Sequence, residues 1–94
     1  MFTSQFTVNA TGDPEPVTAF TDCRSISIFQ DTADATQLAY KVRAPFLTSQ
    51  TVQRHAGTQH FFTRADGQAG FRKGDIVGYV ETVSSSATFH QVEQ

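Results

Sequence analysis

Short runs in which apolar and polar residues alternate are the feature that most constrains this chain. The run "FTSQFTV" (residues 2–8) places Phe2, Phe6 and Val8 on one face and threonine and glutamine on the other, as a half-buried strand requires. No 11-residue window keeps the i, i+3, i+4 apolar spacing of an amphipathic helix. Comparable runs recur at residues 17–21, 24–30, 37–43, 51–55, 59–64, 75–83 and 87–94. About eight short antiparallel strands predict an all-β fold, a single small β-sandwich of jelly-roll or Greek-key type spanning residues 1–94.

Two of these runs allow predictions for individual side chains. Residues 24–30 are predicted to form a central strand, because Ile26 and Ile28 share one face while Phe29 lies on the other. In residues 37–43 the alternation predicts that Leu38, Tyr40 and Val42 face the core.

The connections between the runs carry turn residues. Residues 44–50 include a proline and are interpreted as a crossover, which makes residues 51–55 an edge strand. Residues 74–91 hold two strand-like runs around a serine cluster and are interpreted as a hairpin, with Gly78 marking a bulge or a close approach of another backbone. The segment "DTADAT" (residues 31–36) is compatible with one helical turn capped by Asp31.

The composition is unusually poor in charge. Only 17% of the residues are charged, against about 25% in a typical domain, and the net charge is −2. Scattered basic residues disfavour nucleic-acid binding, and a weakly charged polar surface favours a protein that is covered by partners. No run approaches a membrane-spanning length and the first 12 residues lack a signal-peptide pattern, so we expect synthesis in the cytosol and no export signal.

A catalytic reading of residues 74–91 is disfavoured. Asp75, Glu81 and His90 flank the serines at 84–86, but no Gly-x-Ser-x-Gly turn is present to strain a serine or to supply an oxyanion hole. Three adjacent serines are typical of a loop. We therefore expect no catalytic residues and no enzyme activity.

The sequence also gives little support for a metal site. His55, His60 and His90 do not have the spacing of a zinc site, and Cys23 has no second cysteine to join it, so it is interpreted as a small residue at a strand end. Asp31 and Asp34 lack the further ligands of a calcium loop. We expect no metal ion and no cofactor.

Aromatic residues suggest contact surfaces instead. Tyr40 and Tyr79, the amphipathic rings that a sugar platform would need, fall inside apolar runs and are interpreted as packing residues. Phe20, Phe29 and Phe61 lie opposite the apolar faces of their strands or in a doublet, and exposed rings on a small domain mark contact surfaces.

The chain resembles a known family in its strand pattern. An N-terminal strand, "CRSISIFQDT" followed by "YKVRAP", a late "GDIVGYVETV" and a terminal "ATFHQ" resemble the small β-sandwich decoration or cement proteins of tailed bacteriophages. The resemblance implies a non-enzymatic virion protein on the outside of the capsid that bridges and stabilises capsid subunits. Its implied partners are the major capsid protein and further copies of itself, as a dimer or trimer, without nucleic acid or membrane. The residues predicted to make these contacts are Phe2, Phe6, Phe46, Phe71, Arg72, Tyr79 and Phe89.

Two alternatives remain open from the sequence. One is a receptor- or glycan-binding module of a phage head, tail fibre or spike. The other is a small cytosolic enzyme of a type that the residues do not identify.

Overall fold

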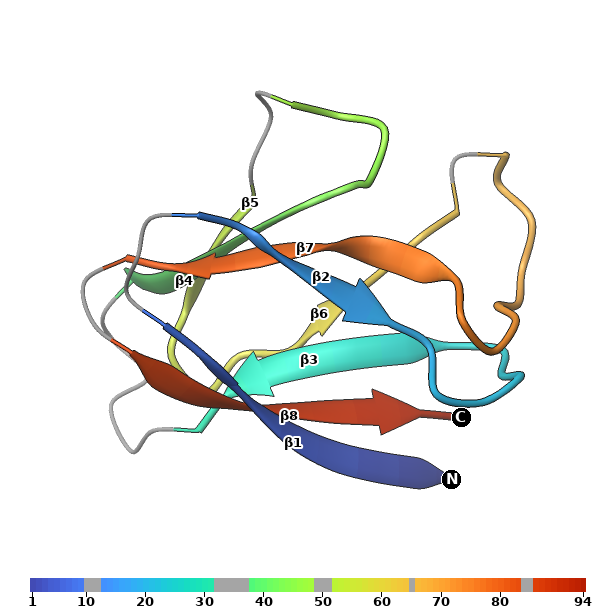
Figure 1. The fold of residues 1–94 in the computed structure, drawn as a ribbon, viewed down its shortest axis with the longest axis horizontal. Helices are drawn as coiled ribbons and strands as arrows, with labels where there is room; N and C mark the ends of the chain where they lie inside the picture. The colour runs from blue at the N-terminus through green and yellow to red at the C-terminus, as the bar shows by residue number, and fades with distance from the viewer. Residues whose placement is uncertain (10–12, 32–37, 49–51, 65, 84–85) are drawn as a thin grey trace.

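The protein folds into two facing antiparallel sheets, which confirms the prediction of an all-β sandwich (Figure 1). The computed structural model describes residues 1–9, 13–31, 38–48, 52–64, 66–83 and 86–94. Within these ranges there is no helix, and so none long and apolar enough to cross a membrane. The strands are β1 (Phe2–Val8), β2 (Glu15–Thr18), β3 (Ile26–Gln30), β4 (Leu38–Arg43), β5 (Val52–His55), β6 (His60–Phe61), β7 (Ile76–Thr82) and β8 (Ala87–Glu93).

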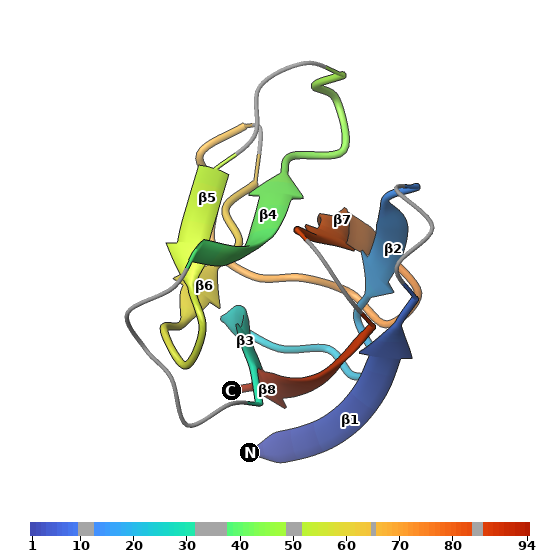
Figure 2. The same cartoon turned by 90° about the vertical axis from the view of Figure 1, so that its left-hand side faces the viewer.

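The strand order is that of an eight-stranded jelly roll. One sheet has the order β1-β8-β3-β6 and the other β2-β7-β4-β5 (Figures 1 and 2). The chain therefore behaves as one long hairpin in which β4 pairs with β5, β3 with β6, β2 with β7 and β1 with β8. The hairpin wraps, and the additional pairs β3–β8 and β4–β7 complete the two sheets.

The predicted connections were wrong in two places. Residues 74–91 do not form a hairpin, because β7 and β8 lie in different sheets. Residues 44–50 are not a crossover, since β4 and β5 are neighbours in the same sheet and pair antiparallel. The strands β7 and β8 pair with strands from the first half of the chain, so the turn residues between them do not indicate a hairpin. Residues 51–55 were correctly predicted as an edge strand, which is β5.

Both roles predicted for Gly78 are confirmed. The β2–β7 register passes from Val17 opposite Gly78 to Thr18 opposite Ile76, so Val77 is an additional residue on β7. A Cβ atom on Gly78 would lie 2.8 Å from the backbone carbonyl oxygen of Arg43, which is the predicted approach of another backbone, and 2.4 Å from a ring carbon of Phe62. Glycine is therefore required here by close packing against both residues.

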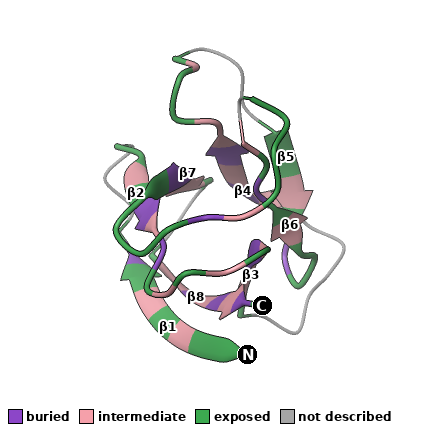
Figure 3. Cartoon of the chain, turned by 90° about the vertical axis from the view of Figure 1, so that its right-hand side faces the viewer, coloured by how far each residue is buried: buried purple, intermediate pink, exposed green. Residues whose placement is uncertain are grey.

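The core lies between the sheets and is centred on a few rings. Tyr40 and Phe89 are completely buried, with an edge-to-face contact of 5.2 Å between ring centroids. The predicted central strand is confirmed, because β3 lies between β8 and β6 and Ile26, Ser27 and Ile28 are all buried. Figure 3 colours the ribbon by burial, and in it β1 is largely exposed or half-buried.

One inward-facing prediction for β4 was wrong. Tyr40 and Val42 are buried, but Leu38 is 48% exposed. The β4–β5 register passes from Leu38 opposite His55 to Tyr40 opposite Arg54, so Ala39 is an extra residue that interrupts the alternation. Ala39 packs against the core instead. Residues 32–36 of the helical turn considered for residues 31–36 lie outside the described residues, and so does Asp34, which was considered with Asp31 as a calcium ligand.

Candidate functional site

A buried polar cluster links the last strand, β8, to the chain between β2 and β3. The Glu93 side chain is 1% exposed, and its carboxylate accepts hydrogen bonds from the backbone N–H groups of Phe20 and Thr21, each 3.0 Å long. The Thr21 hydroxyl and the Gln91 amide also donate to it, each at 2.7 Å. Burial by itself raises the pKa of Glu93, but these four hydrogen bonds hold the pKa below its ordinary value. The carboxylate is therefore ionised, and its hydrogen bonds hold the segment between β2 and β3 in place.

A groove runs beside this cluster, between the edge strands of the two sheets. It has a volume of about 230 Å³ and is lined by Phe6, Glu15, Pro16, Thr18, Phe20 and Gln91. Phe20 is 46% exposed, and its ring centroid lies 5.8 Å from that of Phe2, which is also exposed. The groove therefore combines exposed aromatic rings with polar groups, and exposed apolar surface of this kind is common at contact sites.

The sequence indicated one wall of this groove but not the groove itself. Phe20 was predicted to be an exposed aromatic residue, and it is exposed. Glu93 and Gln91 were not singled out, because a polar residue near the end of a strand carries no local sign that it is buried. The adjacency of β1 and β2 at one side of the sandwich follows from pairings between distant parts of the chain.

Exposed apolar side chains also occur at the opposite edge of the sandwich, formed by β5 and β6 (Figure 2). Phe61 on β6 is 56% exposed, as predicted from the "FF" doublet, and Val52 on β5 is exposed as well. Phe46 in the β4–β5 connection is 60% exposed. Apolar surface is therefore present at both edges of the sandwich.

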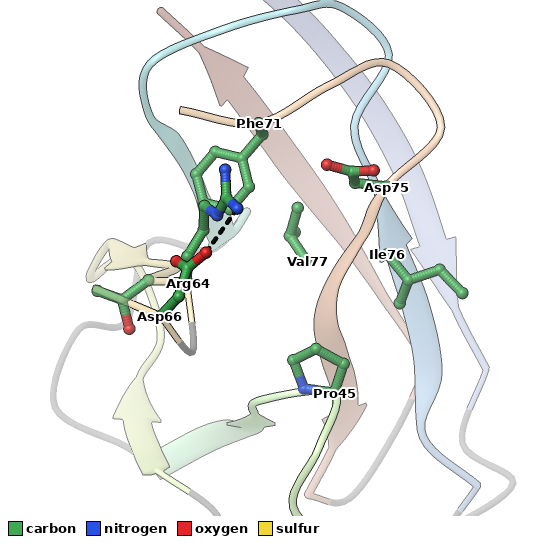
Figure 4. A pocket seen from close by; sticks show the side chains of 8 residues that line it. Pro45, Arg64, Asp66, Phe71, Asp75, Ile76 and Val77 are labelled. Atoms are coloured by element: carbon green, nitrogen blue, oxygen red, sulfur yellow. Dashed lines mark hydrogen bonds and ion pairs between the residues drawn. The ribbon is translucent and has the colours of Figure 1, made fainter. Parts of the chain in front are cut away.

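A pocket with both charged and apolar walls lies near the β6–β7 connection (Figure 4). It has a volume of about 310 Å³, and its walls include Arg64, Asp66, Phe71 and Asp75. Arg64 forms a 2.7 Å ion pair with Asp66, and the backbone N–H of Gln68 and this guanidinium hold the pKa of Asp66 below its ordinary value. In Figure 4 Asp75 stands apart from this ion pair, across the pocket. The pocket offers carboxylates and a guanidinium that can bind hydroxyl groups.

The groups considered for acid–base catalysis do not converge. His90 on β8 forms a 3.1 Å pair with Asp31, and its ring stacks on Phe29 at 4.8 Å. Asp75 accepts a hydrogen bond from the backbone N–H of Arg72, in the turn before β7. The acid beside His90 is thus Asp31, and not Asp75 or Glu81. Ser84 and Ser85 lie outside the described residues.

The candidate metal ligands are also separated. In the part of the chain that the structure describes, no three His, Cys, Asp or Glu side chains form a group that could hold a metal ion. The sequence also allowed His55 and His60 to approach each other across a hairpin, but β5 and β6 belong to different sheets and do not pair with each other. Burial and the charge of Arg54 lower the pKa of His60 to about 4, and burial raises the pKa of the Cys23 thiol.

Five of the residues predicted to contact partners reach the surface. Phe2, Phe46 and Arg72 are exposed, whereas Phe6 and Tyr79 are half-buried. The Tyr79 ring lies under the guanidinium of an arginine on β4, 4.2 Å from its carbon to the ring centroid.

The other two predicted contact residues belong to the core. Phe89 is completely buried between the sheets, and Phe71 is also buried. Phe71 is held by reciprocal backbone hydrogen bonds with Cys23 that lie at the end of the sandwich. The Phe89 ring is enclosed between the sheets, whereas the mostly buried Phe71 ring borders the pocket near the β6–β7 connection. Tyr40 is likewise buried, and its hydroxyl donates to the Thr58 carbonyl, so it provides no sugar platform.

Comparisons with protein-family models, with curated proteins and with solved structures found no match to this chain.

Proposed function

We propose that this chain is a non-enzymatic bacteriophage virion protein, which decorates the outside of the capsid and stabilises the assembled head by bridging capsid subunits. The observation that carries the proposal is the presence of exposed apolar side chains at both edges of one small sandwich. Phe20 lies at the β1–β2 edge, and Phe61 at the β5–β6 edge. A bridging protein needs contact surfaces that face different neighbours.

The weak charge of the surface supports the same function. Charged residues are depleted in the centre of protein interfaces and aromatic residues are enriched there. Only 17% of this chain is charged, and Phe46 and Phe61 are both more than half exposed. Each junction on a capsid is expected to bury about 1,000 Å² or more, and the symmetry of the shell multiplies modest contacts. The jelly-roll fold is found in viral capsid proteins and in lectins, which is support by analogy only.

Co-sedimentation with capsids tests this function. Purified chain is mixed with tailed-phage heads that lack a decoration protein, and the copies bound per head are counted from the mass of the particles. We expect saturable binding that Phe61→Ser or Phe46→Ser weakens about tenfold, because each removes an exposed ring from the contact. The matched control is Gln59→Ser, an exposed polar residue close to Phe61. Heads that bind no copies, or bind all three variants equally, would contradict the proposal.

A glycan-binding module is the second candidate, and the pocket in Figure 4 favours it. Asp66, Asp75 and Arg64 are groups that hydrogen-bond sugar hydroxyls, although no exposed tyrosine or tryptophan ring is among the residues that line the pocket. A glycan array on which the chain gives a signal that Asp75→Asn abolishes would favour this function over capsid binding.

A further inference from the structure

The four edge strands of the sandwich differ in how they are protected. β2 has four residues and contains Pro16, β5 has four residues and contains Arg54, and β6 has only two residues. Short length, proline and charge are the devices that stop an edge strand from pairing with another chain. β1 has seven residues, "FTSQFTV", with neither proline nor charge. It is the one edge without these devices among the eight strands that the structure describes.

The hydrogen-bond ladder shows which backbone groups of β8 face β3. Ser25 and Gln94 exchange two backbone hydrogen bonds of 3.0 Å, and the Asp31 N–H donates to the Thr88 carbonyl at 2.8 Å. In an antiparallel ladder, successive residues direct their backbone groups to opposite sides. The even-numbered residues of β8 therefore bond to β3, and the odd-numbered residues bond to β1.

The same alternation fixes the outer edge of β1. The odd-numbered residues of β8 lie opposite Phe2, Ser4, Phe6 and Val8, so these four direct their backbone groups toward β8. Thr3, Gln5 and Thr7 consequently direct their N–H and C=O groups away from the sheet. On that side, none of the strands that the structure describes pairs with β1.

We infer that this edge binds the β1 strand of a second copy of the chain, in an antiparallel pair with Gln5 on the two-fold axis. Thr3 then pairs with the partner's Thr7, and Gln5 with the partner's Gln5. This register uses all three outward-facing residues and the full length of the strand. It brings no like charges together, since β1 is uncharged. The inference deepens the proposed function, because it assigns one of the two edges to self-association.

The groove beside β1 supplies the apolar part of the contact. In this register the Phe6 ring lies diagonally opposite the partner's Phe6, at the mouth of the groove that Phe6, Pro16 and Phe20 line. A single strand pair buries less than the ~1,000 Å² of a stable interface, so the additional burial of the exposed Phe2 and Phe20 rings is needed. β1 is an edge strand and also lines the groove, so pairing of two β1 strands would cover the groove at the same time.

Sedimentation equilibrium of the full chain tests the inference. We expect a reversible dimer. Gln5→Pro removes the two hydrogen bonds on the axis, and should raise the dissociation constant about thirtyfold. The Gln5 N–H points away from β8, so the internal ladder is kept. Gln5→Glu and Gln5→Lys each bring two like charges together and should weaken the dimer about fivefold. An equimolar mixture of the Glu and Lys variants should dimerise at least as tightly as wild type.

The matched control is Gln53→Glu, the same change on the edge strand β5, which should leave the dissociation constant unchanged. Thermal unfolding of each variant establishes that it is folded, and the charge variants decide the result if Gln5→Pro does not fold. Three outcomes overturn the inference: a monomer at roughly millimolar concentration, no recovery in the Glu and Lys mixture, or equal weakening by Gln53→Glu. A monomer that still binds heads overturns the dimer alone, whereas a dimer that ignores heads overturns the proposed function alone.

Discussion

At two corners of the sandwich the chain crosses from one sheet to the other, and the two corners are held by different kinds of hydrogen bond. At each corner the chain leaves the β2-β7-β4-β5 sheet and enters the β1-β8-β3-β6 sheet. The corner between β2 and β3 is held by the ionised carboxylate of Glu93, which accepts hydrogen bonds from the backbone N–H groups of Phe20 and Thr21. The corner between β5 and β6 is held by a neutral phenol, because the Tyr40 hydroxyl donates to the Thr58 carbonyl. Burial raises the pKa of Tyr40, which keeps this donor protonated.

The difference follows from which backbone groups each corner leaves without a partner in a sheet. The first corner presents N–H groups and requires an acceptor, whereas the second presents a carbonyl group and requires a donor. Hydrogen bonds to an ionised group are about twice as strong as neutral ones. We therefore expect the first corner to depend more strongly on its single side chain than the second.

The largest expected effect is that of Glu93→Ala. It leaves four buried or half-buried donors without their acceptor and should lower the free energy of unfolding by about 3 kcal/mol or more. Urea unfolding followed by circular dichroism measures it. Glu81→Ala, the same change on β7, is the control and should cost less than about 1 kcal/mol. Equal losses in the two variants would show that Glu93 does not hold the corner.

Gly78→Ala should have the next largest effect, and it tests the packing beside the second corner. The new Cβ would lie 2.4 Å from the Phe62 ring and 2.8 Å from the Arg43 carbonyl oxygen, so we expect a loss of about 2 kcal/mol. Adding Phe62→Leu should recover part of it, as a double-mutant cycle from urea unfolding would report. Fully additive losses would contradict the close approach.

Tyr40→Phe isolates the neutral hydrogen bond of the second corner. It should lower the free energy of unfolding by about 1 kcal/mol, which is less than the Glu93→Ala loss, because only a neutral hydrogen bond is removed. Tyr79→Phe is the matched control, since that half-buried ring packs under the Arg43 guanidinium and keeps this contact without its hydroxyl. If Tyr40→Phe costs as much as Glu93→Ala, the two corners do not differ as described.

The smallest expected effect is a pH dependence that separates the corners. His60, at the start of β6, has a folded-state pKa of about 4 against 6.5 for a free histidine. The unfolded chain therefore binds a proton more readily, and stability should fall as the pH decreases from 6.5 to about 4. Because the ring is only partly buried, we expect a shallow slope, and urea midpoints for His60→Gln should be flatter over this window. His55→Gln, an exposed histidine, should keep the slope.

Glu93 acts in a lower pH window. Its folded-state pKa lies below the ordinary value of 4.5, so its contribution is complete above that value and is lost as the pH falls through the lower, folded-state pKa. The loss of stability below pH 4.5 should therefore be smaller in Glu93→Gln than in the wild type. A wild-type slope in both variants, His60→Gln and Glu93→Gln, would exclude these two groups as its source.

The sequence predicted the burial of side chains correctly where the alternation within a strand decides it. It did not predict burial where contacts with other strands decide it. Val8, Ile26, Ile28 and Val42 are buried as their period-two positions predict, because the inner face of a strand is decided by the strand itself. Leu38 is exposed because a single extra residue in β4 reverses the alternation, and a bulge of this kind has no local signal. The candidate groove escaped prediction for a related reason, since its walls come from β1, β2 and β8.

By itself, the sequence determined the class of the fold and the central strand, since alternation and turn residues act within a few residues. At position 78 it indicated a bulge or a close approach, but the requirement for glycine comes from Phe62 and Arg43, which are distant in the chain. Only the tertiary structure decided which strands pair, which rings remain in water and that Glu93 is buried. These properties depend on contacts between separate strands and loops, and some of these contacts join residues more than 70 positions apart, such as Glu93 with Phe20 and Thr21. The wrapping of one long hairpin brings such residues together, and no local pattern encodes that step.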